Sequence, residues 1–580
     1  MVKKPKSQTF LIGAFILTVS SIVVKLCGAL FKIPLTNLIN DDGMGYFNSA
    51  YVLYNSLYIL ATAGMPITVS KMISSSNAVG RKAEGKKILG IAIMLYGSLS
   101  LLLSLFVFCF PTVVAGIIGN SEAAYALRAI SPSIFLVSTI SALKGYFQGN
   151  RNMQPTAISN VIEALTKLIF GLLIANYMMN NGYSMPMVAA GAILGVTVGA
   201  LINALYMMTN YLISGRQYTF SESMSPLPSR RFKVVLKEFL LLCIPVLLGA
   251  LTMNLTNLID LTLIMRRLVT SGLTEETALK LYGETFLKDT ANSLALREYV
   301  SNKLYGDTLI KDAANSLAFI KYAANKQYGA YSAMAVTMFN LPMLFITALS
   351  TSVVPVISGA FAAKNKDKVK SMVNQALRLT SLVTMVCALG ISVMSKPILT
   401  FLFSGSPKGI EIAAPLLSIL AIAILGLGLS TVMTGMFQAI GKPQVPVLVM
   451  FFCALVKIVL NYFLIANPAI GITAAPIGTN VCYLLMVILD IFLLYKYTGV
   501  FVNIFQLIVK PLIASGLCAA AAYFSYGFII LHAPQKAALI LSLGLAAIVY
   551  LIMIIVLKIL TAEDLEMLPF GKKLKFSKKS

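Results

Sequence analysis

Residues 145–168 read GYFQGNRNMQPTAISNVIEALTKL, and residues 435–458 read GMFQAIGKPQVPVLVMFFCALVKI. Each stretch has a Gly-x-Phe-Gln start, a basic residue, a proline and a late Ala-Leu-x-Lys, and the two starts lie 290 residues apart. The chain therefore contains an internal repeat. A weaker echo pairs Pro66 and Ser70 with Pro355 and Ser358.

Long apolar segments surround both copies. The 580 residues are 58% hydrophobic and only 12% charged, with a mean hydropathy of +0.85. Soluble domains are about 45–50% apolar and about 25% charged, and a membrane-spanning helix needs about 20 mainly apolar residues. We predict an all-α integral membrane protein with about fourteen transmembrane helices. They are expected at 9–35, 46–73, 87–112, 122–147, 153–179, 185–213, 234–266, 328–360, 371–394, 411–440, 444–466, 470–496, 504–530 and 536–560.

Basic residues gather in alternate loops between these segments. The net charge is +25, which in a soluble protein would suggest nucleic acid, but lysine and arginine in short loops mark the cytoplasmic side. Both termini are therefore predicted to be cytoplasmic, which requires an even number of spans, and no nucleic acid is expected. The deciding groups are Lys3, Lys4 and Lys6; Arg81, Lys82, Lys86 and Lys87; Arg230, Arg231 and Lys233; and the tail 572–579.

The repeat predicts two parallel six-helix bundles followed by two extra C-terminal helices. Parallel repeats about an axis along the membrane normal are typical of transporters that rock around a central site. We expect an N-lobe at 1–214, a cytoplasmic linker at 215–233, a C-lobe at 234–497, two further spans at 498–560 and a basic tail at 561–580.

A second, more recent repeat lies inside an insertion at 267–327. Residues 281–295 read LYGETFLKDTANSLA, and residues 304–318 read LYGDTLIKDAANSLA, a period of 23. We predict a helical hairpin on the outer face. It is either a tolerated surface insertion or a cap and docking site for wall-synthesis proteins.

Lysines occur inside the predicted spans. Lys25, Lys167 and Lys457 fall near mid-membrane, where each costs about 2.5–3.5 kcal/mol unless it meets water or a partner. Lys32 extends a stripe with Ser21, Lys25 and Gly28 along one helix face. A cavity lined by these cations would favour an anion such as pyrophosphate. Alternatively, Glu163 neutralises Lys167 four residues later, and Lys32 extends to the interface.

A candidate cation site combines Asp260, Asn461 and Thr479. Carboxylate, amide and hydroxyl oxygens suit a hard cation such as sodium, although hydrogen bonds between helices are the simpler explanation. The cysteines form no CxxC pair and His532 is the only histidine, so no metal site is assigned. No nucleophile, zinc or ATP-binding motif occurs. We therefore expect a transporter without a cofactor, driven by Na+ or H+ coupling or by mass action.

Two segments carry a family resemblance. Residues 45–54 read GYFNSAYVLY and residues 61–72 read ATAGMPITVSKM, which ends at Lys71 and Met72. With the Gly-x-Phe-Gln segments and with Asn254, Asp260, Arg266 and Arg267, they resemble the stage V sporulation protein B / polysaccharide transporter family. That family is part of the multidrug/oligosaccharidyl-lipid/polysaccharide exporter superfamily.

The resemblance implies two six-helix lobes around a central cavity, alternating access and transport of undecaprenyl-linked sugars to the outer leaflet. It implies that Lys25 and Lys32 are counterparts of basic residues in the first span of related lipid II flippases, and we add Lys71 to the cavity cations. It also implies the sodium role of Asp260, Asn461 and Thr479. The family's basic residue before the proline of span 8 is missing, since residues 337–341 read TMFNL.

The leading hypothesis is a flippase for a lipid-linked sugar precursor, in contact with membrane lipids. One alternative is a cation-coupled multidrug exporter of the same superfamily, which a basic cavity disfavours because such drugs are usually cationic. Others are a membrane-embedded sugar polymerase or ligase, which would need a large outer loop with catalytic acids, and a non-transporting scaffold for wall or spore assembly.

Overall fold

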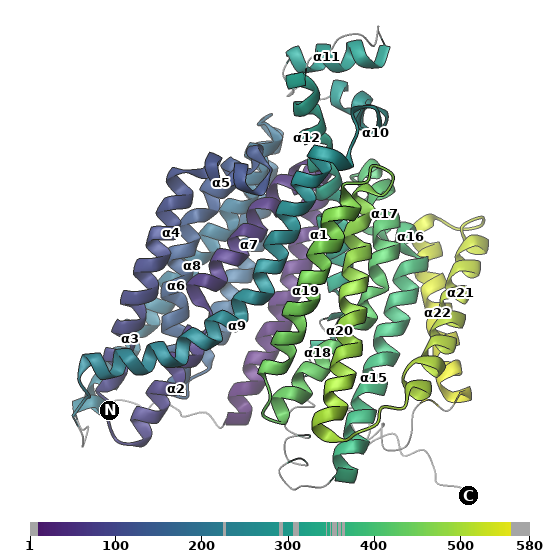
Figure 1. Cartoon of the computed structure of the whole chain (residues 1–580). Helices are drawn as coiled ribbons and strands as arrows, with labels where there is room; N and C mark the ends of the chain where they lie inside the picture. Colours follow the sequence, from purple (N-terminus) through teal and green to yellow (C-terminus); the bar gives the residue numbers. More distant parts are fainter. Residues whose placement is uncertain are drawn as a thin grey trace, which may run out of the picture. The chain divides into compact units, whose positions relative to one another are not determined.

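A computed structural model describes residues 10–557 and Ile559, apart from 224–227, 289–293, 306–312, 344 and all of 348–365 except Ser350, Ile357 and Phe361. The described residues form helices joined by turns, without a strand among them (Figure 1), which confirms the all-α prediction. The basic residues before 10, the tail 561–580 and the echo at Pro355 and Ser358 lie outside the described residues.

Ten helices of the described part are long and apolar enough to cross a membrane, or eleven if the bent pair Pro407–Ala421 and Ala423–Ala439 counts as one span. Large apolar side chains cover their surfaces: Leu102 is 67% exposed and Ile555 is 72% exposed. A water-soluble protein rarely exposes apolar area on this scale, so these faces suit lipid. The count of fourteen stays a prediction, because most of 344–365 in the expected eighth span is not described.

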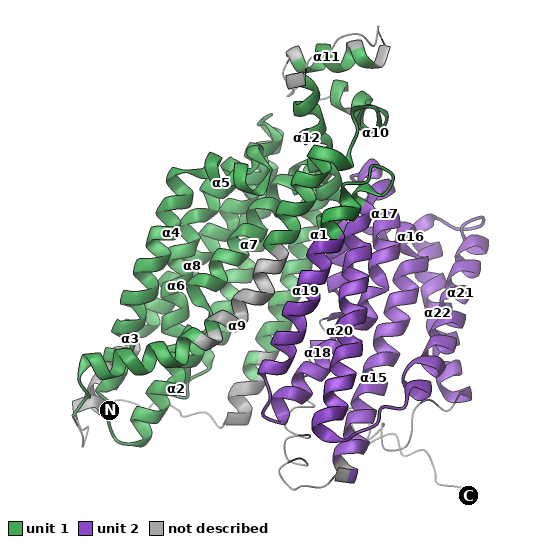
Figure 2. Cartoon of the chain, viewed as in Figure 1, with its two compact units in different colours: residues 1–333, 461–472 green, residues 334–460, 473–580 purple. Residues whose placement is uncertain are grey.

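The chain divides into two compact units (Figure 2). Unit 1 comprises residues 1–333 and 461–472, and unit 2 comprises 334–460 and 473–580. In unit 1 the helices are α1 (Phe10–Thr62), α2 (Met65–Ala78), α3 (Glu84–Ala92), η1 (Ile93–Gly97), α4 (Ser98–Cys109), α5 (Pro111–Ile118), η2 (Ser121–Ala123), α6 (Ala124–Gly149), α7 (Gln154–Asn180), α8 (Met185–Ser223), α9 (Phe232–Arg267), η3 (Leu268–Gly272), α10 (Glu275–Lys288), α11 (Leu294–Tyr305), α12 (Ala313–Ala330) and the start of η4 (Tyr331–Ala335).

The helices that follow η4 complete the described part of the chain. They are α13 (Val336–Asn340), α15 (Lys366–Val393), α16 (Ser395–Leu402), α17 (Pro407–Ala421), α18 (Ala423–Ala439), α19 (Gln444–Ile465), η5 (Gly471–Thr473), α20 (Ala474–Thr498), η6 (Phe505–Val509), α21 (Lys510–Ile529) and α22 (Gln535–Val556). The core of unit 2 packs α15, α18 and α20 around Met433, Met436 and Phe437, which are all fully buried.

The first two expected spans share α1, which is broken at Asn40 (φ 54°, ψ −170°). The rings of Phe31 and Phe47 nevertheless lie 5.8 Å apart, whereas sixteen residues of straight helix would extend about 24 Å. The chain therefore folds back at Asn40, and the two arms of α1 pack against each other. The expected span 46–73 is also interrupted, because Gly64 is left-handed (φ 78°) and Pro66 starts α2.

The turns at the two copies of the long repeat have matching geometry. Arg151 and Gly441, 290 residues apart, both have positive φ, at 58° and 76°. The backbone N–H of each donates to the carbonyl of a glutamine three residues earlier, at 3.0 and 3.1 Å. The following N–H in each copy donates to the phenylalanine of the Gly-x-Phe-Gln motif. Lys442 is therefore the structural counterpart of Asn152, one position away from the pairing with Arg151 that the sequence suggested.

The described residues of the insertion form the short π-helix η3 and three α-helices, α10, α11 and α12, instead of the predicted hairpin. They pack on one another, and α10 and α11 project beyond the helix bundle of unit 1 (Figure 1). The helix α12 runs on through η4 into the expected eighth span and packs on α1. Gly329 makes this crossing close, since a Cβ there would overlap the carbonyl oxygen of Asp41.

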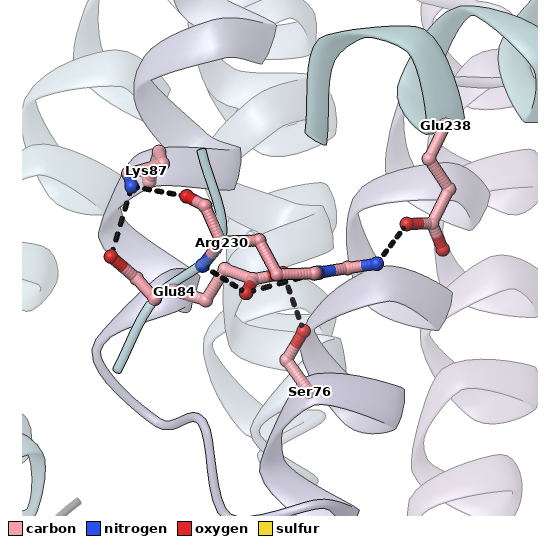
Figure 3. Close-up of polar contacts among 6 residues, drawn as sticks. Ser76, Glu84, Lys87, Arg230 and Glu238 are labelled. Carbon is pink, nitrogen blue, oxygen red and sulfur yellow. Dashed lines mark hydrogen bonds and ion pairs between the residues drawn. The ribbon is translucent and has the colours of Figure 1, made fainter. Parts of the chain in front are cut away.

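The helix α9 belongs to compact unit 1, although the sequence repeat begins the C-lobe with it. An ion cluster fixes its first turns (Figure 3). The guanidinium of Arg230 donates to the fully buried Glu84 at 2.6 Å and pairs with Glu238 of α9 at 2.7 Å. The hydroxyl of Ser76 also donates to Glu84, and Lys87 donates to the carbonyl oxygen of Arg230. This end of the predicted linker is therefore attached to α2 and α3.

Candidate functional site

A cavity of about 450 Å³ lies inside unit 1 among α1, α6, α7 and α8. Three lysines and one glutamate face it, so its lining carries a formal charge of +2. The remaining polar groups are tyrosines, asparagines and one serine. The lining residues are Ser21, Val24, Lys25, Cys27, Gly28, Tyr51, Tyr54, Asn55, Tyr58, Lys144, Asn160, Glu163, Ala164, Lys167 and Val196.

Lys167 on α7 is held by aromatic groups of α1. Its Nζ donates a hydrogen bond of 3.0 Å to the hydroxyl of Tyr51. The same amine lies 4.4 Å from the ring centre of Tyr51 and 5.1 Å from that of Phe31. Ring faces attract a cation, and the single hydrogen bond to Tyr51 leaves two of the three ammonium protons of Lys167 for a ligand.

An aromatic ladder leads along α1 beside the cavity. Adjacent ring centres are 5.7 to 5.9 Å apart from Phe31 through Phe47, Tyr51 and Tyr54 to Tyr58. The four residues after the break at Asn40 are three or four positions apart, which places them on one helix face. The ladder gives the cavity a ring-lined wall opposite the amines of α6 and α7.

Lys144 is a cavity cation that the sequence analysis missed. It lies on α6, lines the cavity, and donates a 2.7 Å hydrogen bond to Oδ1 of Asn160 on α7. The signal was available, because Lys144 directly precedes the first Gly-x-Phe-Gln motif in the expected span 122–147, where Glu122 and Arg128 are the only other charged residues. The rule that selected Lys25 selects it as well.

Glu163 does not form an ion pair with Lys167 in the described part of the chain. Its Oε2 accepts a 2.6 Å hydrogen bond from the amide of Asn203 on α8, and the other end of that amide accepts from Ser159. The carboxylate is therefore oriented by α8, and the lysines outnumber it.

The predicted stripe on α1 lines the cavity only in part. Ser21, Lys25 and Gly28 line it, and a Cβ at Gly28 would meet nothing within 4 Å. Lys32 does not, because its Nζ donates to the carbonyl oxygen of Ser332 at 3.2 Å. Lys32 lies one turn further along α1 than Gly28, where η4 packs and the cavity has ended.

The other two predicted cavity cations lie elsewhere. Lys71 is on an exposed position of α2 and is not among the residues that line the cavity. Lys457 is half-buried on α19 in unit 2. The structure thus brings together Lys25 and Lys167, adds Lys144, and leaves Lys32, Lys71 and Lys457 out of this cavity.

Two of the three predicted cation ligands meet in unit 1. The amide of Asn461 donates to Oδ1 of Asp260 at 3.2 Å, which joins α19 to α9. Asn461 is fully buried, and its Oδ1 has no hydrogen-bond partner among the described residues, so an oxygen suited to a hard cation remains available there. Thr479 lies in unit 2, and its hydroxyl donates to the carbonyl oxygen of Ala475.

A further buried carboxyl, Asp490 on α20, was not selected from the sequence. It is fully buried in unit 2, and its Oδ2 accepts a 2.6 Å hydrogen bond from Ser430 on α18. It is the only acid of the expected span 470–496, and the argument that singled out Asp260 applies to it equally.

Comparisons with known proteins show which protein families this chain resembles. A family profile described as polysaccharide biosynthesis protein matches residues 10–274, and one described as MatE matches residues 317–463. The chain is 23% identical to stage V sporulation protein B of Bacillus subtilis over 97% of this chain and 98% of that protein. It is also 23% identical to the lipid II flippase MurJ of Bacillus subtilis, over 81% and 80% of the two chains.

Solved structures show the same fold. A lipid II flippase MurJ in an inward closed conformation superposes with a TM-score of 0.65 over 94% of this chain and 98% of that chain, at 15% identity. An inward-facing multidrug resistance MATE family transporter gives 0.61 over 82% and 94%, at 12% identity. With its apolar helices, the chain is a multi-pass membrane protein with a transport role. The chain resembles the stage V sporulation protein B / polysaccharide transporter family of the multidrug/oligosaccharidyl-lipid/polysaccharide exporter superfamily.

Proposed function

We propose that the chain moves an undecaprenyl-pyrophosphate-linked sugar precursor across the cytoplasmic membrane by alternating access. The observation that carries this proposal is the cavity of unit 1, where Lys25, Lys144 and Lys167 face Glu163 alone among the lining acids. Positive charge held in a low-dielectric wall attracts an anion more strongly than the same charge in water.

The groups present suit both parts of such a head group. Lys167 and Lys144 each donate one hydrogen bond to a neutral partner, which leaves ammonium protons for phosphate oxygens. The ladder of Tyr51, Tyr54 and Tyr58 offers ring faces and hydroxyls to a sugar. The volume of about 450 Å³ falls within the range of roughly 300–1,000 Å³ that small-molecule sites occupy.

We also propose that transport is coupled to the movement of an ion. Asp260 and Asn461, which meet in unit 1, would supply two oxygens to a sodium ion, or Asp260 would exchange a proton. Both termini would lie in the cytoplasm and fourteen spans would cross the membrane.

The MatE match at 317–463 gives a specific reason to consider a second function, a cation-coupled multidrug exporter. The three amines of the cavity disfavour cationic drugs, because like charges in a low-dielectric site repel.

Depletion of the protein in its own cells separates the two functions. We expect lipid-linked sugar precursors to accumulate, and to be cleared by the wild-type chain but not by a variant with Lys25→Gln, Lys144→Gln and Lys167→Gln. A chain with Lys71→Gln, an exposed lysine outside the cavity, is the matched control. Unchanged precursor levels combined with increased sensitivity to cationic drugs would instead support the exporter.

A further inference from the structure

A second cavity, of about 490 Å³, lies at the end of unit 1 that carries the insertion. One wall comes from α1, from the turn between α5 and α6, and from the start of α8. The other wall is the insertion itself. Its residues in the cavity are Phe286, Leu296, Leu317, Ala318, Lys321, Tyr322 and Asn325.

Hydrogen bonds between buried amide side chains and a carboxylate hold these two walls together. Asn325 of α12 donates through Nδ2 to Oδ1 of Asp42 at 3.2 Å and accepts at Oδ1 from the amide of Asn120 at 2.7 Å. Asn325 is 2% exposed and Asn120 is 5% exposed. Gly329, where α12 crosses α1 closely, lies one helical turn after Asn325. The cavity is therefore preformed, and the insertion is a structural wall.

The floor of the cavity combines a carboxylate with aromatic rings. Asp42 is 6% exposed and accepts a hydrogen bond from the hydroxyl of Tyr46. The rings of Phe286 and Tyr322 stand edge to face with centres 4.7 Å apart. At the rim, Glu122 and Lys321 are exposed. Two carboxylates against one ammonium give this lining a formal charge of −1, opposite in sign to the lysine cavity.

We propose that this pocket binds a small polar molecule that carries a primary ammonium group, with the size of an amino sugar. The ammonium would pair with the carboxylates of Asp42 and Glu122. The rings of Tyr46 and Phe286 line the pocket and can cover the apolar face of the carrier, whereas the ring of Tyr322 already holds the amine of Lys326 at 4.9 Å from its centre. Lys321 at the rim repels the same group. The inference does not depend on what the lysine cavity transports.

The test uses the full-length protein purified in detergent and calorimetric titration with glucosamine at about pH 6.5, below the ordinary pKa of a primary amine. N-acetylglucosamine, which has nearly the same shape but no charge, is the matched probe. Glucosamine is expected to bind about tenfold more tightly than N-acetylglucosamine. Glu122→Gln should weaken glucosamine about tenfold, whereas Lys321→Gln should tighten it, and both positions are exposed, so both variants should fold.

Equal affinity for the two sugars, no binding of either, or glucosamine affinity unchanged in both variants would each overturn the proposal. A cellular arm identifies the source of the amine. Accumulation of lipid-linked precursor in cells carrying Glu122→Gln would assign the ammonium to the transported head group, and normal precursor levels would assign it to a free molecule. The titration remains valid if the transport proposal fails.

Discussion

Lys167 illustrates how this protein holds a cation inside a helical bundle without an acid against it. Its amine contacts one hydroxyl and two ring faces, while the nearest acid on its own helix, Glu163, is engaged by Asn203. A cation held by neutral groups keeps its charge available to a ligand. This makes Lys167 the residue on which the anion site depends most.

Substitution of Lys167 by methionine keeps the length of the side chain and removes its charge. We expect geranyl pyrophosphate, a short probe of the lipid-pyrophosphate group, to bind about tenfold more weakly, because one charge-assisted contact is lost. Lys71→Met, at an exposed position outside the cavity, should leave the dissociation constant unchanged. Equal losses in the two variants, measured by calorimetry on purified protein, would show that general surface charge attracts the probe.

Arg151 occupies a backbone conformation that its glycine counterpart adopts without strain. Its φ of 58° costs a residue with a Cβ about 1 kcal/mol, and its side chain is exposed. Arg151→Gly should therefore raise the thermal unfolding midpoint. Gly441→Ala, where φ is 76° and the space for a Cβ is free, should lower it by a similar amount. A lower midpoint for Arg151→Gly would mean that the side chain makes a stabilising contact.

At the scale of elements, the attachment of α9 depends on the cluster around Arg230. Arg230→Met leaves Glu84, which is fully buried, without its cation, and removal of one partner from a buried pair costs about 3–5 kcal/mol. The guanidinium is 29% exposed, so we expect the lower end of that range. Thermal unfolding in detergent measures the loss.

Glu238 provides the control for this prediction. Its carboxylate contacts the same guanidinium but is 39% exposed, and exposed pairs contribute about 0–1 kcal/mol. Glu238→Gln should therefore have a small effect. If both variants lose equal stability, burial of Glu84 is not what makes the cluster important.

The close crossing of α1 and α12 leads to a second prediction at the scale of helices. Gly329→Ala places a methyl group against the backbone of Asp41, and overpacking of this kind typically costs 1–3 kcal/mol. Gly90→Ala in α3, where a Cβ meets nothing within 4 Å, should be neutral or slightly stabilising, since alanine favours helix. Trypsin sensitivity of the insertion, at Arg297 for example, should rise in the first variant only.

Much of this element-level structure could be predicted from hydropathy, and the failures have identifiable causes. Hydropathy located α7, α22 and the start of α8 to within a few residues, because long apolar runs dominate their signal, but α8 continues to Ser223, beyond the expected end at 213. The expected spans 9–35 and 46–73 required the chain to reverse between them, and the break at Asn40 confirms this reversal. Hydropathy did not show that helix continues on both sides up to the break. The break at Gly64 and Pro66 carried both breakers, yet it fell inside a continuous apolar run.

The sequence predicted which types of residue line the candidate site, but it could not predict where each side chain points. The rule that charges inside spans matter selected Lys25 and Lys167 and would have selected Lys144 and Asp490. It could not show that Lys32 turns to the carbonyl of Ser332, because that contact joins residues 300 positions apart. Likewise, the role of the insertion as a cavity wall depends on tertiary packing of α12.

At the scale of the whole molecule, sequence family, fold and cavity charge agree on transport across a membrane. The family relation extends over nearly the full chain, and the same fold serves flippases and multidrug transporters. The fold therefore does not select the cargo. In our proposal the charge of the cavity selects the cargo, so the proposed cargo depends on the three lysines of unit 1.

Reconstituted transport tests this claim most directly. The full-length protein is placed in phospholipid vesicles with an undecaprenyl-pyrophosphate lipid bearing a fluorescent sugar, and movement between leaflets is followed by quenching from one side. We predict that the wild type exchanges the lipid, that glutamine at Lys25, Lys144 and Lys167 together slows exchange at least about tenfold, and that arginine at the same positions preserves most of it. Exchange at the wild-type rate by the glutamine variant, or no exchange by the wild type above protein-free vesicles, would contradict the account.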